Sequence, residues 1–192
     1  MARTKKETVQ KEKVVNDSIS PELVMKSVTD YLDKEGFKYL MLEDKICEIV
    51  IQGDNLSIQL MYYVYNNHLI LRVPHFIRNV DVMRPKVVYL MNYAMNEILD
   101  IRFEVGEEGK SISSSVQHVL GNTVPTEAQL RYLTMLIINV TDNYYQKFIQ
   151  AIYSGTPFKH VADEMQEDID EGIEETEEMS MADLIGDPLK IN

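Results

Sequence analysis

Residues 46–73, ICEIVIQGDNLSIQLMYYVYNNHLILRV, decide the fold of this chain. Apolar side chains recur at every second position, which is the period of a strand with one buried face. Two breaks, Gly53-Asp54 and Asn66-Asn67, place residues that favour tight hairpin turns between the apolar runs. The stretch therefore predicts three antiparallel strands joined by two-residue turns.

These turns also predict which residues face each other across the strands. With a two-residue first turn, Ile49 pairs with Ile58, and with a two-residue second turn, Tyr62 pairs with Leu71. A slip of one residue would turn the apolar face outward, so both turns agree on one buried face. The opposite face then carries a mixed row of side chains: Met61, Tyr63, Tyr65, Ile70 and Arg72.

Helical patterns surround this meander. Ser20 and Pro21 are a typical helix start, and Gly36 is a typical stop. Residues 87–99 form a second helix whose apolar arc is wider than the ~100° stripe of a surface helix. Alternating residues at 101–116 predict a hairpin, and residues 126–153 have the apolar spacing of a long helix. The sequence thus predicts an α+β fold with the order helix, three-stranded antiparallel meander, helix, β-hairpin, long helix.

The helix at 87–99 contains two asparagines, which are poor helix formers. We expect Asn96 to be solvated and Asn92 to hydrogen-bond at the rim of the core. A catalytic role for the pair is the alternative.

Charge divides the chain into three parts. Residues 1–19 mix lysine and glutamate without apolar periodicity and predict a flexible charged arm, followed by a domain at 20–155. Residues 156–192 predict an acidic, largely disordered tail, since 161–192 hold twelve acidic residues and one lysine. The net charge is −12, and a nearly neutral domain with an acidic tail argues against nucleic-acid binding, which needs a basic surface.

Few residues are suited to catalysis or to metal binding. Cys47 is the single cysteine, and no apolar run has the length of a membrane span or a signal peptide, so we expect a cytoplasmic protein without membrane contact. The sequence contains no phosphate-binding glycine loop and no nucleophile elbow. We therefore expect no enzyme activity and no cofactor. We also expect no metal, because the four histidines lack the spacing of metal ligands: His68, His75, His118 and His160.

Four short segments carry a family resemblance. They are LMNYAMNEI at 90–98, RFEV at 102–105, PTEAQL at 125–130 and DNYYQKFIQAI at 142–152. With the order of elements, they resemble the YbjN family of bacterial sensory transduction regulators, whose fold is similar to the dimeric type III secretion chaperones. The resemblance covers about residues 20–153 and supplies no catalytic residues. It implies a non-enzymatic module that binds a protein or peptide client, either chaperone-like or a regulatory adaptor in bacterial stress or signalling.

Two hypotheses for function follow. In the first, the row from Met61 to Arg72 is the client-binding surface, since tyrosine, methionine and arginine are enriched in interfaces; the alternative is that another helix covers this row. In the second, the chain is a small-molecule sensor or an uncharacterised enzyme with a pocket between the sheet and the long helix. A convergent set of polar residues at one cavity would favour the second.

Two further surfaces are predicted to bind protein. We expect a homodimer built partly on the helix at 87–99, through Val87, Met91, Met95 and Ile98. The tail ends in a short amphipathic segment, with Met181, Leu184, Ile185 and Leu189 as docking residues for the domain's own apolar surface or for a partner. The alternative is an acidic solubility tail whose apolar end does nothing.

Overall fold

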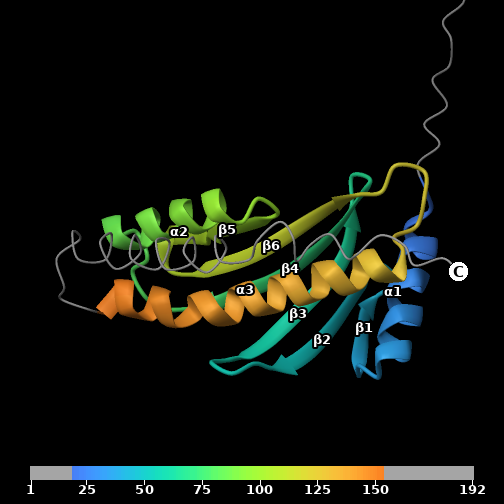
Figure 1. The fold of residues 1–192 in the computed structure, drawn as a ribbon, viewed down its shortest axis with the longest axis horizontal. Coiled ribbons are helices and arrows are strands. Elements are labelled where there is room, and N and C mark those ends of the chain that lie inside the picture. Colours follow the sequence, from blue (N-terminus) through green and yellow to red (C-terminus); the bar gives the residue numbers. More distant parts are fainter. Residues whose placement is uncertain (1–18, 154–192) are drawn as a thin grey trace, which may run out of the picture.

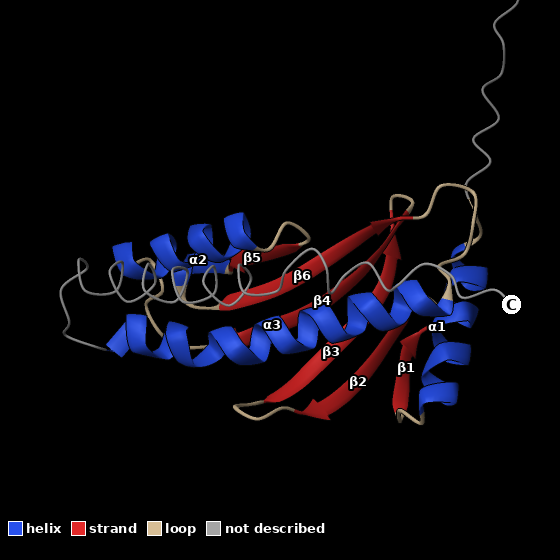
Figure 2. Cartoon of the chain, viewed as in Figure 1, coloured by secondary structure: helices blue, strands red, loops and turns tan. Residues whose placement is uncertain are grey.

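The computed structural model describes residues 19–153, which form a helical layer on one face of a six-stranded antiparallel sheet (Figures 1 and 2). The order of strands in the sheet is β1-β2-β3-β4-β6-β5. The α+β class is confirmed. The elements are α1 (Pro21–Glu35), β1 (Tyr39–Glu43), β2 (Ile46–Gln52), β3 (Ser57–Tyr65), β4 (His68–Ile77), α2 (Pro85–Glu97), β5 (Ile101–Val105), the 3-10 turn η1 (Glu107–Gly109), β6 (Ile112–Val119) and α3 (Glu127–Tyr153).

The long helix α3 organises the helical layer. Figure 1 shows α3 crossing the sheet, with α1 near the β1 end and α2 near the β5 end. Two hydroxyl pairs fasten α3 to the sheet: Tyr62 to Thr134 at 3.0 Å, and Ser114 to Thr141 at 2.6 Å. All four residues are buried, so each hydroxyl that leaves water keeps a partner.

The first helix ends as its sequence predicts. Gly36 adopts the left-handed region at φ 75°, where a side chain would be strained. Its N–H donates to the Asp33 carbonyl, and the Phe37 N–H donates to the Leu32 carbonyl at 2.9 Å. These bonds satisfy carbonyls that the end of the helix leaves open.

The meander has one strand more than predicted. Strand β1 pairs with β2 through Leu40 opposite Glu48 and Met41 opposite Cys47. The prediction of a three-stranded meander was therefore wrong by one edge strand. Strand β1 shows no alternation of burial, since four of its five residues are exposed, so it lacks the pattern that identifies a strand.

The first hairpin is also wider than predicted. Ile49 pairs with Leu60 rather than Ile58, so four residues lie between the strands instead of two. A shift of two residues keeps every side chain on its predicted face, which is why the apolar pattern did not distinguish the two registers. The second hairpin has the predicted register, with Tyr62 opposite Leu71.

The predicted helix at 87–99 lies at Pro85–Glu97. Asn92 and Asn96 are both exposed, and the Asn92 side-chain amide donates to the Val88 carbonyl one turn earlier at 3.0 Å. Asn92 thus makes a hydrogen bond, as expected, but to its own helix rather than to core groups.

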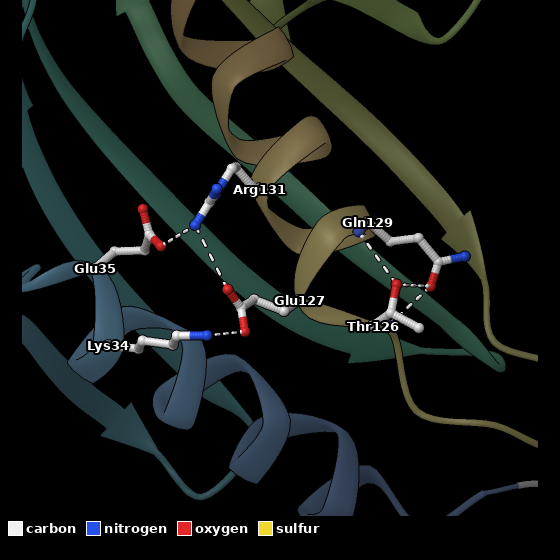
Figure 3. Close-up of polar contacts among 6 residues, drawn as sticks. All are labelled: Lys34, Glu35, Thr126, Glu127, Gln129 and Arg131. Atoms are coloured by element: carbon white, nitrogen blue, oxygen red, sulfur yellow. Dashed lines mark hydrogen bonds and ion pairs between the residues drawn. The ribbon is translucent and has the colours of Figure 1, made fainter. Parts of the chain in front are cut away.

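The start of α3 is a capping box. The Thr126 hydroxyl accepts the Gln129 backbone N–H at 3.3 Å, and the Gln129 side-chain oxygen accepts the Thr126 N–H at 2.8 Å (Figure 3). Both bonds satisfy N–H groups that a helix start otherwise leaves open.

Ion pairs connect the start of α3 to the end of α1. Lys34 pairs with Glu127, and Arg131 pairs with Glu35 and, at 3.5 Å, with Glu127 (Figure 3). Apart from Glu35, these side chains are well exposed to water, so the ion pairs contribute little to stability.

Candidate functional site

The face of the sheet opposite the helices, which we call the outer face, carries the five predicted binding residues. Side chains alternate along a strand, so the burial of Leu60 and Tyr62 against the helices turns Met61, Tyr63 and Tyr65 to the other side. Cross-strand pairing then places neighbours together: Tyr63 lies opposite Ile70, and Met61 lies opposite Arg72.

Exposure varies within this row. Tyr65 is 62% exposed, Met61, Tyr63 and Arg72 are half-buried, and Ile70 is buried between its neighbours. The row therefore combines an accessible aromatic residue, Tyr65, with a packed apolar residue, Ile70. Aromatic residues, methionine and arginine are enriched in protein interfaces.

Further apolar side chains extend the outer face toward β1. Leu40 lies in register with Glu48, which lies opposite Met61. Both Leu40 and the β2 residue Val50 are exposed. Sequence reasoning missed Leu40 because it missed the strand that carries it.

Arg72 is held in place on the outer face. Its guanidinium pairs with the Glu104 carboxylate at 2.7 Å, and the same carboxylate accepts the Ser115 hydroxyl at 3.0 Å. These contacts join β4, β5 and β6, and they fix a cation beside the apolar row. The nearby Arg102 lies opposite Ser115 and is exposed.

The four predicted dimer residues are divided between core and surface. Val87 is fully buried and Met91 is buried, both in the chain's own core. Met95 and Ile98 are half-buried and pack against the edge of that core, and the following Leu99 is 90% exposed. Of the four predicted dimer residues, only Met95 and Ile98 are therefore accessible to a second copy, beside Leu99.

The predicted docking residues of the tail, Met181, Leu184, Ile185 and Leu189, lie outside the described residues, as does His160.

Two of the three histidines within residues 19–153 have a local hydrogen-bonding partner. His68 Nδ1 lies 2.7 Å from the Asn66 carbonyl, and His75 Nδ1 lies 2.9 Å from the Ser111 hydroxyl. Within residues 19–153, no three His, Cys, Asp or Glu side chains gather in a way that could hold a metal ion. None of the described helices is long and apolar enough to cross a membrane.

Cys47 is a core residue on the helix-covered face. It has no exposed surface, and burial raises the pKa of its thiol to about 11. A thiol that stays protonated at neutral pH is a poor nucleophile and a poor metal ligand.

The space between the sheet and α3, where a ligand pocket was one hypothesis, is filled by side chains. Tyr62, Leu71 and Phe148 are fully buried there. Phe148 stacks edge-on against Phe103 at a centroid distance of 5.1 Å. The buried hydroxyls of this layer bond to one another, so they do not converge on an open cavity.

An open groove of about 480 Å³ lies instead on the exposed side of α3. It is lined by Ala128, Arg131, Tyr132, Met135, Leu136 and Asn139. Tyr132 is anchored, because its hydroxyl donates to the Asp100 carboxylate at 3.1 Å.

Comparison with known proteins identifies the fold. No family model matches the chain, and no curated protein matches it. A chain in the crystal structure of the ExsC-ExsE complex matches it with a TM-score of 0.51 at 10% sequence identity, over 67% of this chain and 95% of that one. At this identity the likeness shows the fold alone: the chain has a type III secretion chaperone-like fold.

Proposed function

We propose that this chain is a non-enzymatic, cytoplasmic protein- or peptide-binding module, either chaperone-like or a regulatory adaptor, and that it binds its client through the outer face. The observation that carries the proposal is the row Met61, Tyr63 and Tyr65 beside Arg72, on the side of the sheet away from the helices. Aromatic and apolar side chains beside a fixed cation suit a protein partner.

The structural neighbour supports the same class of function. The matched structure is a complex of two proteins, ExsC and ExsE. A fold that binds a protein in one case is a reasonable scaffold for protein binding in another, although function resides in the site and not in the fold.

Two finer proposals accompany this one. The order of elements and the segments at 90–98 and 142–152 support a divergent member of the YbjN family, with a role in bacterial stress or signalling. The exposed Leu99 beside Met95 and Ile98 supports a homodimer through the end of α2.

Affinity purification from the native host, followed by mass spectrometry, tests the proposed function. The tagged full chain is compared with the variant Tyr65→Glu, which puts a charge on the outer face, and with Leu23→Glu on the exposed side of α1. Both sites are more than half exposed, so both variants should fold. We expect a polypeptide that is recovered with the full chain and Leu23→Glu but lost with Tyr65→Glu. Equal recovery in all three would contradict binding at the outer face.

A further inference from the structure

We propose that residues 179–189 of this chain dock in the groove on the exposed side of α3, lined by Tyr132, Met135 and Leu136. This proposal goes beyond the proposed function, since it concerns the opposite side of the molecule. Either one can fail without the other.

The groove presents apolar surface that the described residues leave open. Tyr132 is 56% exposed and Met135 is 45% exposed, on the solvent side of a helix whose other side is packed into the core. Leu136 is half-buried at the floor, and Arg131 supplies a cation at the rim. A groove of this kind accepts the apolar face of a short helix.

The segment 179–189 has the complementary pattern. Met181, Leu184 and Ile185 follow one another at positions i, i+3 and i+4, which gather on one side of a helical turn, while Gly186 and Pro188 end a helix before Leu189.

The connecting chain is long enough to reach the groove. Met135 lies 18 residues before Tyr153 on α3, which is about 27 Å at the helical rise. The connection from 154 to 178 has 25 residues, and a chain of that length can span at most roughly 80–90 Å when fully extended. A tether that can reach its site makes binding intramolecular, which raises the effective concentration of the tethered segment.

The exposed positions of α3 along this route carry no charge. Between the groove and Tyr153, exposed residues recur at spacings of three and four on the solvent side of α3. All of them have neutral amide side chains: Asn139, Asn143, Gln146 and Gln150. The acidic residues of α3 are Glu127, which pairs with Lys34, and Asp142, which is buried against the β2–β3 turn. The ten acidic residues at 163–178 therefore meet no exposed carboxylate on α3 itself between the groove and Tyr153; the neighbouring carboxylates belong to other elements, and Asp100 among them accepts the Tyr132 hydroxyl.

The outer face suits the segment less well. It lies on the far side of the sheet from α3, so the connection would have to pass around a sheet edge. It also carries the carboxylates of Glu48 and Glu104, which repel an acidic chain.

A spin label on the full chain tests this docking. Ser180→Cys takes the label, and Cys47 is fully buried, so the unsubstituted chain treated with the same reagent is the labelling control. We expect severe paramagnetic loss of amide signals at residues 128–139 and intact signals at Tyr63 and Tyr65. Loss at the outer face, or no local loss anywhere, would overturn the proposal.

Two controls assign the effect to the groove and to one molecule. Met135→Glu should restore the signals at 128–139, while Val50→Glu, at an exposed apolar site on the outer face, should leave the loss unchanged. In the second control, ¹⁵N-enriched chains that carry no spin label are mixed with spin-labelled chains that contain no ¹⁵N enrichment. Signal loss in that mixture would mean docking on a second copy and would contradict docking within one chain.

Discussion

Asp142 on α3 binds Asn55 at the tip of the β2–β3 hairpin: its carboxylate accepts the Asn55 backbone N–H at 3.0 Å and the Asn55 side-chain amide at 3.1 Å. The same carboxylate accepts the backbone N–H groups of Asp54 and Leu56, each at 3.1 Å. Asp142 is only 5% exposed, and a buried charge is tolerated when it is bonded in this way. The long helix therefore sets the shape of the first turn.

Asp142→Asn tests this contact. An amide has one acceptor oxygen and two N–H donors, so part of the turn loses its acceptor and meets a donor instead. We expect the free energy of unfolding in urea to fall by about 2–3 kcal/mol. Asn143→Ala, at the exposed neighbouring position, should change it by less than about 0.5 kcal/mol. Equal effects at the two positions would contradict the account.

Gly53 approaches the same carboxylate. A Cβ atom at Gly53 would lie 2.2 Å from Asp142 Oδ1, too close for any real contact. Gly53→Ala should therefore destabilise the chain, and should do so less in an Asp142→Ala background, where that oxygen is gone. A double-mutant cycle measured by urea unfolding should give a coupling of about 1 kcal/mol or more. Additive effects of the two substitutions would contradict a steric clash between a side chain at position 53 and the Asp142 carboxylate.

The two methionines of α2 should respond differently to aspartate. Met91 is buried, so Met91→Asp leaves an unpaired carboxylate in the core and should cost several kcal/mol of stability. Met95 is half-buried beside the exposed Leu99, so Met95→Asp should keep the fold and weaken a dimer. Circular dichroism reports the first effect and light scattering the second. A wild-type mass of 22.2 kDa in light scattering would contradict the dimer itself.

Cys47 should be protected from thiol reagents. Burial raises its pKa from 9.0 to about 11, so at about pH 8 the folded thiol is protonated as well as inaccessible. The folded state holds this proton more tightly than the unfolded state, so the contribution to stability is complete below pH 9.0 and is lost as the pH rises toward about 11. We expect a disulfide reagent to modify Cys47 in urea but only slowly without it. Fast reaction of the folded chain would contradict its position in the core.

The sequence predicted those parts of the fold that have a strong period. Strand β3 alternates in burial from Ser57 to Tyr63, and its register with β4 through Tyr62 and Leu71 was correct. The width of the first turn depends on Asp142, 87 residues away from Asn55, and no local pattern contains that contact. Strand β1 is an exposed edge, so burial left no alternating signal in its residues.

The candidate site was predictable in its placement but not in its surroundings. The period of two places Met61, Tyr63 and Tyr65 on one face whatever the register. The burial of Val87 was not predictable, because a wide apolar arc on a helix does not say which part packs against α3 and which part remains for a partner.

Measured affinity for a purified client is the most direct test of the outer face as a protein-binding surface. Titration calorimetry would compare the full chain with Tyr63→Glu and Tyr65→Glu, and with the control Leu23→Glu on α1. If Tyr63 and Tyr65 are central to the interface, each variant should raise the Kd about 30-fold or more, the loss typical of an interface hot spot, while the control should leave it unchanged. An unchanged Kd in both tyrosine variants would contradict the central claim.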